Sequence, residues 1–292
     1  MSFRWSFRVD QAGLLIIGAN GQLGRALQAK YPAAQAVDSN LLDITAAQQL
    51  ADFDWSSVKT IINAAAYTNV DGAETADGRP LAWKINANGA ANLAQIASLN
   101  DITLVHISSD YVFDGTLNPH TETEDYSPLS VYGQSKAAGD IAVALAPKHY
   151  LLRATWVIGE GKNFVGIMLG LGQRGIAPTV VSDQIGRLTF TSELVAIIDH
   201  LVTTNAAYGT YNATNSGEPA SWADITRLIF TVAGYDLAVT DTSTAEYYAG
   251  KDGIAPRPLN SIMDLSKLAA TGYTGHDWHE DLSTYIQKEL AK

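Results

Sequence analysis

Two tyrosine–lysine pairs have the residue types and the spacing for proton transfer. One pair is Tyr132 and Lys136, in the string VYGQSKAAGD, and the other is Tyr247 and Lys251. A phenol has a pKa near about 10 and is a slow acid at neutral pH, but a neighbouring ammonium stabilises the phenolate and lowers that pKa. Such a pair suits general acid catalysis of carbonyl reduction. Because both pairs have the same spacing, their surroundings must distinguish them.

The neighbouring residues favour the first pair. Residues four apart share one face of an α-helix, and the string SKAAGDIAVALA (135–146) predicts a helix that begins close to Tyr132. Around the second pair, Gly250 and Gly253 weaken any helix. We therefore expect Tyr247 to lie on the surface with its lysine.

A serine adds a third group to the first pair. Ser109 ends the apolar string ITLVHISS, which predicts a strand. At that end of a strand in a doubly wound sheet, polar groups face the ligand crevice. We predict that Ser109, Tyr132 and Lys136 are the catalytic residues, with Ser109 bonded to the substrate carbonyl and the tyrosine hydroxyl.

A glycine-rich turn, GANGQLG, follows the apolar string LLII and precedes a helix-like stretch. The first glycine permits a tight turn, the second lets the backbone approach a pyrophosphate, and the N-terminus of the following helix favours an anion. The order strand, turn and helix is typical of a dinucleotide-binding fold. The predicted cofactor contacts in this turn are Gly18, Asn20, Gly21, Gln22, Leu23 and Gly24.

Acidic residues follow the second expected strand. Asp38 lies about 20 residues after Gly18, where a carboxylate binds a ribose 2′-hydroxyl and repels a 2′-phosphate. This position favours NADH, although an ordinary strand-end aspartate is the alternative. Asp43 and Ile44 are expected to reach the adenine.

The order of elements predicts the fold. Strand-like and helix-like segments alternate from Leu14 to about Val157. This pattern predicts an α/β protein with a Rossmann-type, doubly wound parallel sheet. We predict a dinucleotide-binding domain of residues 13–158 plus about 179–215, and a smaller, partly discontinuous α+β substrate domain of about 159–178 plus 216–292. Residues 1–12 are expected to be a leader, a linker from a longer protein or an expression remnant.

Composition excludes several classes of function. The chain of 292 residues carries a net charge of −11, so a nucleic-acid partner is not expected. It has no cysteine, which excludes disulfides, thiolate nucleophiles and cysteine-bound metals and fits a cytoplasmic location. No apolar run reaches the roughly 20 residues that span a membrane.

The string HDWH (276–279) holds two histidines three residues apart. A zinc site needs further ligands, and no set of carboxylates and histidines lies near these two in the sequence. We therefore predict no metal site and expect HDWH to pack the C-terminal helix.

Taken together, these motifs resemble a known family. The GxxGxxG turn followed by Ser109, Tyr132 and Lys136 resembles the extended short-chain dehydrogenase/reductase family. The resemblance narrows to its dTDP-4-dehydrorhamnose reductase branch and runs from about Leu14 to Leu290. The strings that carry it are GANGQLG, NAAAYTNVDGAE, SSDYVFDG, VYGQSKAAGD, LLRATWVIG with NF at 163–164, VVSDQIG and RPLNSIMD.

The resemblance implies a reaction and roles. The reaction would be reduction of the C4 ketone of dTDP-4-dehydro-L-rhamnose to dTDP-L-rhamnose, with NADPH or NADH as hydride donor. Tyr132 would be the proton donor, Lys136 would also bind the nicotinamide ribose, and Ser109 stands where the family usually has threonine. Cofactor contacts are implied at Asn63, Ala64 and Ala65. Contacts with the substrate or with the adjoining part of the cofactor are implied at Thr68, Val70, Asp110, Tyr111, Trp156 and Asn163.

Three of the implied contacts remain open at this stage. Trp156 would stack on the sugar or flank the nicotinamide. Arg187 stands where the family commonly has a small residue, and it would pair with a diphosphate or be a surface charge. Arg257 is a comparable diphosphate candidate.

The resemblance also bears on partners and on rival functions. Some relatives dimerise with magnesium, so Mg²⁺ and a homodimer are implied, and a linker at residues 1–12 would suit a fusion to the epimerase that acts one step earlier. The rival functions are another nucleotide-sugar enzyme of this fold, such as an epimerase or dehydratase, and a non-catalytic NADP-binding regulatory subunit like that of methionine adenosyltransferase. Intact Ser109, Tyr132 and Lys136 argue against the regulatory subunit.

Overall fold

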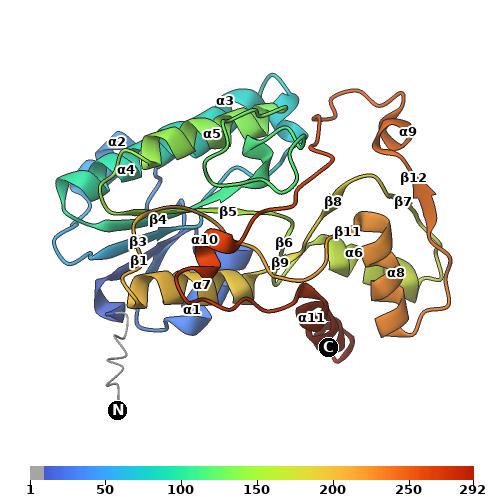
Figure 1. The fold of residues 1–292 in the computed structure, drawn as a ribbon. Coiled ribbons are helices and arrows are strands. Elements are labelled where there is room, and N and C mark those ends of the chain that lie inside the picture. The colour runs from blue at the N-terminus through green and yellow to red at the C-terminus, as the bar shows by residue number, and fades with distance from the viewer. Residues whose placement is uncertain (1–9) are drawn as a thin grey trace, which may run out of the picture.

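A computed structural model describes residues 10–292, and Figure 1 shows a central sheet with helices on both faces. Six parallel strands lie in the order β2-β1-β3-β4-β5-β10. Their bounds are β1 (Leu14–Ile17), β2 (Gln35–Val37), β3 (Thr60–Asn63), β4 (Thr103–Ser109), β5 (His149–Ala154) and β10 (Gly209–Asn212). The chain order reverses between β1 and β3, so a ligand crevice is expected at the carboxyl ends of these strands. The predicted Rossmann-type fold is confirmed.

Two helical layers cover the sheet (Figure 1). One layer holds α2 (Ala47–Asp52), α3 (Gly78–Ala82), the π-helical segment η3 (Trp83–Gly89), α4 (Ala90–Leu99) and α5 (Val131–Val143). The other holds α1 (Gln22–Lys30) and α7 (Thr191–Thr203). Alternation along β1 explains the two layers, because Leu14 and Ile16 pack toward α1 and α7 while Leu15 and Ile17 pack toward the other layer. Helix α3, η3 and α4 follow one another without a break from Gly78 to Leu99, with a wider turn at η3.

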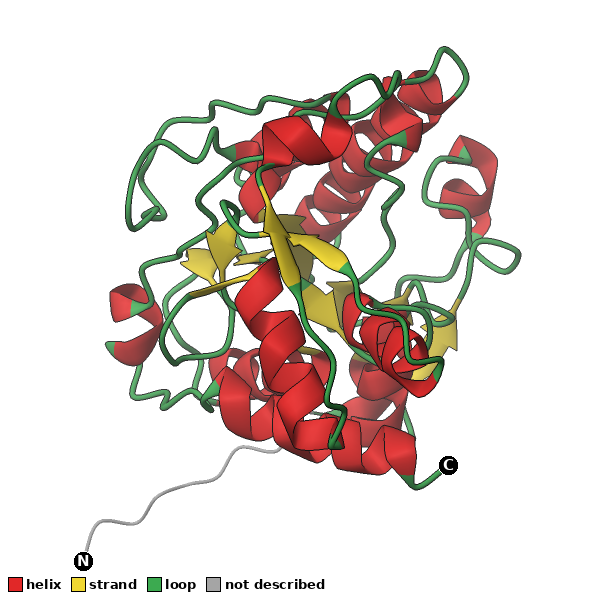
Figure 2. Ribbon diagram, turned by 90° about the vertical axis from the view of Figure 1, so that its right-hand side faces the viewer, coloured by secondary structure: helices red, strands yellow, loops and turns green. Residues whose placement is uncertain are grey.

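A smaller lobe lies beside the sheet and faces the viewer in Figure 2. Its helices are α6 (Phe164–Gln173), α8 (Trp222–Ala233), α9 (Thr244–Tyr248) and α11 (Trp278–Leu290). Its short strand pairs are β6 (Val157–Ile158) with β9 (Thr189–Phe190), β7 (Thr179–Val181) with β12 (Thr240–Thr242), and β8 (Ile185–Gly186) with β11 (Ala220–Ser221). The short helix α10 (Ser266–Ala269) packs near β10.

The hydrophobic clusters place the border between the two parts. Val180, Leu188 and Phe190 belong to the cluster that also includes α6, α8 and α11, whereas α7 and Tyr211 of β10 belong to a sheet cluster. We therefore place the return to the dinucleotide-binding part at about residue 191 rather than 179. The expected leader lies partly outside the described residues: positions 1–9 are not described, and η1 (Gln11–Gly13) leads into β1.

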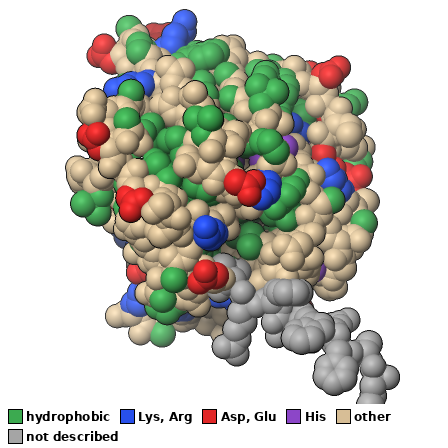
Figure 3. Space-filling view, turned by 90° about the vertical axis from the view of Figure 1, so that its left-hand side faces the viewer, with side chains coloured by type: hydrophobic (Ala, Val, Ile, Leu, Met, Phe, Trp, Pro, Cys, Tyr) green, Lys and Arg blue, Asp and Glu red, His purple; other side chains and the backbone are tan. Residues whose placement is uncertain are grey.

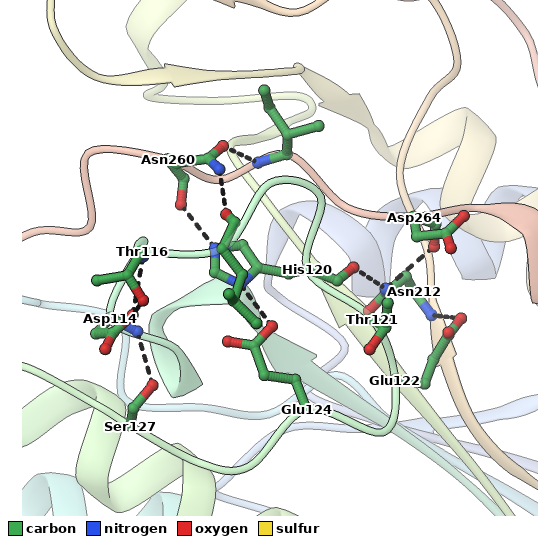
Figure 4. A network of polar contacts seen from close by, with 12 residues as sticks. Asp114, Thr116, His120, Thr121, Glu122, Glu124, Ser127, Asn212, Asn260 and Asp264 are labelled. Carbon is green, nitrogen blue, oxygen red and sulfur yellow. Dashed lines mark hydrogen bonds and ion pairs between the residues drawn. The ribbon is translucent and has the colours of Figure 1, made fainter.

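The connection between β4 and α5 is tied to distant segments (Figure 4). His120 is buried, with Nδ1 at 2.7 Å from Glu124 and Nε2 at 3.1 Å from the carbonyl oxygen of Asn260. Asn212 of β10 donates to the carbonyl oxygens of His120 and Asp264. This network fixes the 260–264 segment against the end of the sheet, next to the site described below.

The surface carries charges of both signs. On the face shown in Figure 3, acidic and basic side chains of the described residues are interspersed among apolar ones. Within residues 10–292, every helix is too short or too polar to cross a bilayer.

Candidate active site

A cavity of about 630 Å³ lies at the carboxyl ends of the central strands. It brings together three parts that are far apart in sequence: the glycine-rich turn, the residues after β3 and β4, and the first turns of α5. The predicted site residues in its wall are Asn20, Gly21, Gln22, Leu23, Ala64, Thr68, Val70, Ser109, Asp110, Tyr111, Tyr132, Lys136 and Trp156. The three predicted catalytic residues therefore share one cavity.

A second cavity of about 330 Å³ adjoins the first across the glycine-rich turn. Asn20, Gly21 and Ala64 line both cavities. The other predicted residues in the wall of the second are Gly18, Asp38, Asp43, Ile44 and Ala65. Two adjoining cavities that meet over a helix N-terminus fit a dinucleotide, with a pyrophosphate at the turn and one nucleoside on each side.

Close packing explains two of the glycines in the turn. Gly18 has φ +86°, and a β-carbon there would lie 2.6 Å from the backbone nitrogen of Ala65. A β-carbon on Gly24 would lie 2.1 Å from the carbonyl oxygen of Gly18. Gly24 lines neither cavity, so the predicted contact with the cofactor is not at the cavity wall. Its lack of a side chain lets α1 pack against the turn. The turn therefore depends on glycine at both positions.

Asp38 keeps its negative charge at the second cavity. Its carboxylate accepts hydrogen bonds from the backbone of Asn40 at 2.9 Å and from Asn20 Nδ2 at 2.7 Å. The Asn40 bond is the main reason that its pKa is lower than usual. The side chain is ionised at neutral pH and lies where a ribose would be bound.

Tyr132 and Lys136 both lie on α5, as predicted. The helix begins at Val131 because the Ser130 hydroxyl caps it by accepting the Gly133 backbone N–H at 3.1 Å. Lys136 is buried, and its ammonium donates to the carbonyl oxygen of Ile107 at 2.7 Å. Burial lowers the pKa of Lys136 to about 8.

The expected lowering of the Tyr132 pKa is wrong for this structure. Burial raises the pKa of Tyr132, the charge of Asp110 raises it further, and the Ser109 hydroxyl opposes both. The main reason is that the phenol itself is desolvated, and an acidic side chain also stands close to it. Tyr132 therefore holds its proton at neutral pH, as the predicted proton donor must.

Ser109 and Asp110 form a buried polar pair at the end of β4. The Ser109 hydroxyl donates to Asp110 at 2.9 Å and accepts the Tyr111 backbone N–H at 3.2 Å. Asp110 also accepts a hydrogen bond of 2.6 Å from Ser261, and burial raises its pKa. Asp110 thus orients Ser109 toward the cavity.

Aromatic rings line the part of the cavity toward the smaller lobe. Trp156 has a positive φ of 43° and stacks on Trp222, with ring centroids 3.8 Å apart. Tyr111 meets the Tyr132 ring edge to face at 5.5 Å. Flat apolar faces of this kind suit the ring of a sugar.

Several predicted residues lie outside both cavities. Asn63 is buried, and its amide accepts the Ala65 backbone N–H at 3.1 Å, so it shapes the turn after β3. Asn163 caps α6 by accepting the Gly166 N–H at 3.0 Å. Its predicted substrate contact does not occur at the cavity wall, because the amide is used for capping.

The two arginines differ from each other. Arg187 donates to the carbonyl oxygens of Gly217 at 2.6 Å and Met263 at 3.1 Å, and it lies outside the cavity. It is half-buried, lines a separate hollow beside Met263, and ties backbone segments together. Arg257 pairs with both oxygens of Asp71 at 2.9 Å and lies near Tyr111.

The second tyrosine–lysine pair is on the surface, as predicted. Tyr247 is 41% exposed, and the ammonium of Lys251 lies over its ring at 4.0 Å. Helix α9 ends at Tyr248, before the lysine, so the two residues do not share a helix.

The sequence reasoning missed charged residues at the mouth of the cavity. Arg25 and Lys162 line it together with Glu160, and Arg25 donates to the backbone carbonyls of Asn20 and Glu160. Arg25 directly follows the last glycine of the turn, which was an available signal. Lys162 comes from a loop that only the tertiary fold brings to the site.

Known proteins are similar to this chain in fold and in sequence. The family described as the RmlD substrate binding domain matches residues 12–291. A dTDP-4-dehydrorhamnose reductase of Aggregatibacter actinomycetemcomitans is 37% identical, over 93% of this chain and 97% of the relative. A dTDP-4-keto-6-deoxy-D-glucose reductase of Streptomyces niveus is 38% identical, over 91% and 90%. The structure of a Bacillus anthracis dTDP-4-dehydrorhamnose reductase in complex with NADP has a TM-score of 0.86 at 36% identity, over 94% and 98%. The chain therefore belongs to the RmlD family of dTDP-4-dehydrorhamnose reductases, a family of oxidoreductases.

Proposed function

We propose that this chain reduces the C4 ketone of dTDP-4-dehydro-L-rhamnose to dTDP-L-rhamnose, with NADPH or NADH as the hydride donor. The observation that carries the proposal is the shared cavity of Ser109, Tyr132 and Lys136, which opens from the glycine-rich turn. Family membership supports the substrate, and the NADP-bound relative supports the cofactor class.

In the proposed reaction, the reduced nicotinamide supplies a hydride to C4 of the sugar when it is bound. Tyr132 gives its phenolic proton to the ketone oxygen, so the carbonyl becomes an alcohol and the tyrosine a phenolate. Ser109 would turn its O–H from Asp110 to that oxygen and hold it by a hydrogen bond while charge develops on it. The protonated form of Lys136 stabilises the phenolate until a proton from water restores the phenol.

The substrate would extend toward the smaller lobe. We place the sugar ring beside Trp156, because this side chain lines the cavity and is braced by Trp222. Arg257 is the proposed partner of the diphosphate, since its guanidinium is held near Tyr111 by Asp71. Arg187 is not proposed for this role, because it lines a separate hollow beside Met263 and two of its nitrogens donate to backbone carbonyls there.

The test is NADPH or NADH consumption by the purified chain with dTDP-4-dehydro-L-rhamnose. Loss of reduced-cofactor absorbance in equal amount to the alcohol formed is the expected result. No consumption, with magnesium present or absent, would overturn the proposal. Turnover of the sugar without net cofactor consumption would instead identify an epimerase or dehydratase, because these enzymes regenerate their cofactor. Cofactor binding without any turnover would favour the regulatory subunit.

A second candidate substrate is a dTDP-4-keto-6-deoxy-D-glucose, because the Streptomyces niveus relative is named for it. The chemistry at C4 is the same, and the two sugars differ in ring stereochemistry. A comparison of kcat/KM for the two ketones decides between them, since discrimination between substrates is measured by that ratio.

For assembly, we propose a homodimer that uses the exposed apolar side chains of α5 and the residues after it. Ile141 is 55% exposed and Leu145 is 81% exposed. Light scattering with and without magnesium gives the mass in solution and tests whether magnesium is required. Fusion to an epimerase also remains a proposal, and the length of the natural gene product tests it.

A further inference from the structure

Three ionisable side chains meet outside the cavity, where α7 approaches the start of α11. Glu193 lies in the first turn of α7, His276 belongs to the string HDWH, and Asp281 lies in the first turn of α11. Their ligand atoms all lie within 4.8 Å of one another. The sequence predicts no metal here because the nearby residues do not complete a site, but the fold brings in Glu193 from 83 residues away.

Glu193 is an incompletely paired acid. Its side chain is 0% exposed, and Oε2 has no hydrogen-bond partner. The other oxygen, Oε1, accepts the backbone N–H of His276 at 3.3 Å. The Tyr273 side chain lies beside this carboxyl group. A buried carboxylate oxygen without a partner is costly, so this position favours a bound cation.

The spacing of the ligand atoms fits a small cation. Glu193 Oε2 lies 3.5 Å from His276 Nδ1. Two ligands at about 2.0–2.2 Å from a tetrahedral zinc ion lie about 3.4 Å apart. Asp281 supplies a third ligand, and the His276 side chain, which is 65% exposed, leaves the outer side open for a water molecule. Two carboxylates would also neutralise the charge of a divalent ion.

An amide orients this set from behind. Asn215 Nδ2 donates to Asp281 Oδ2 at 2.7 Å and to the carbonyl oxygen of His276 at 3.2 Å. Its own oxygen accepts the Phe190 backbone N–H at 2.8 Å. Hydrogen bonds of this kind hold ligands in position and are typical of the residues that surround a metal site.

We propose that Glu193, His276 and Asp281 bind one Zn²⁺ ion that joins α7 to α11. An imidazole with two carboxylates suits zinc, whereas magnesium prefers oxygen ligands in an octahedron. The set therefore does not fit the magnesium implied by the resemblance. Leu194, next to Glu193, lines the catalytic cavity, so the ion would stiffen one wall of the cavity.

The test uses the full chain without a polyhistidine tag, after removal of metals with a chelator. Titration with ZnCl₂ by calorimetry is expected to give one site per chain, and Zn²⁺ is expected to raise the melting temperature. Co²⁺ is expected to give the strong visible absorption of a tetrahedral site. Both His276→Ala and Glu193→Gln should weaken Zn²⁺ binding at least about tenfold, the effect that loss of an outer partner alone can cause.

His279→Ala is the matched control. His279 belongs to the same HDWH string and its side chain is also partly exposed, but its Nδ1 is paired with Asp277 at 2.7 Å. This variant should bind Zn²⁺ like the parent chain. Absence of binding to the parent, or equal binding by the parent and His276→Ala, overturns the proposal. Loss of binding in His279→Ala with retention in His276→Ala also overturns it.

Discussion

The buried ammonium of Lys136 on α5 donates to the carbonyl oxygen of Ile107 on β4, over 2.7 Å. This contact fixes the helix that carries Tyr132 against the strand that carries Ser109. It also places a cation in a desolvated position, where its pKa is lowered from 10.5 to about 8. The burial of this charge therefore lowers the stability of the folded chain at the proposed catalytic site.

We expect Lys136→Met to be more stable than the parent chain at neutral pH and inactive. The buried ammonium of Lys136 lowers the free energy of unfolding by its full amount below pH 8. This destabilisation disappears between about pH 8 and 10.5, because the unfolded chain binds more protons than the folded chain in that window. The shift corresponds to roughly 3 kcal/mol, and the lost bond to Ile107 reduces the gain to about 1–3 kcal/mol. Urea unfolding at neutral pH measures this gain. A less stable variant would contradict the expectation.

The same group predicts how activity depends on pH. If the protonated form of Lys136 stabilises the phenolate, kcat/KM should fall as pH rises through about 8, because this ratio reports the groups of the free enzyme. The expected profile loses about tenfold for each further pH unit. Initial rates at substrate concentrations well below KM across neutral and alkaline pH give the profile. A flat profile through pH 9 would show that the charge of Lys136 is not needed.

Tyr132→Phe removes the proposed proton donor and little else. We expect kcat to fall by about 10²–10⁴-fold while NADPH binding is retained, because the phenol acts on the ketone. Turnover and fluorescence titration of the cofactor measure the two effects. Tyr247→Phe, at the exposed tyrosine of the second pair, is the control and should leave kcat unchanged. If both variants behave alike, Tyr132 is not the donor.

Gly24→Ala should disrupt the cofactor turn. The added β-carbon would lie 2.1 Å from the carbonyl oxygen of Gly18, so backbone must move, at an expected cost of more than about 2 kcal/mol. Gly21→Ala is the matched control for stability alone, since its added β-carbon would lie 3.3 Å from the same oxygen while Gly21 itself lines both cavities. Thermal melts compare the two variants. Equal losses of melting temperature in the two variants would show that crowding at Gly24 does not cause the loss of stability.

Asp38→Asn tests the choice of cofactor. The ionised carboxylate lines the second cavity, and it would repel a 2′-phosphate there. We expect the ratio of NADPH to NADH kcat/KM to rise by roughly tenfold in the variant, because the charge is lost while the shape is kept. An unchanged ratio of the two kcat/KM values would show that the 2′-position of the cofactor's ribose does not lie beside Asp38.

Part of the site was predictable because its signals are local. The glycine-rich turn lies between a buried strand and a helix, and Tyr132 and Lys136 share one helix, so short stretches of sequence contain the pattern. The alternation of strands and helices up to Val157 likewise predicted the parallel sheet. The domain border near residue 179 has a weaker signal in the sequence, since short strands such as β7 and β12 have no clear period.

The sequence by itself determined the fold class, the cofactor turn and the side chains on α5, because each depends on residues close in the chain. Only the tertiary structure decided the use of the arginines: Arg187 ties backbone segments, while Arg257 is held by Asp71. It also decided that burial raises the Tyr132 pKa and that Glu193 meets His276. The physical reason is that desolvation and contacts between distant residues arise only when separate elements pack together.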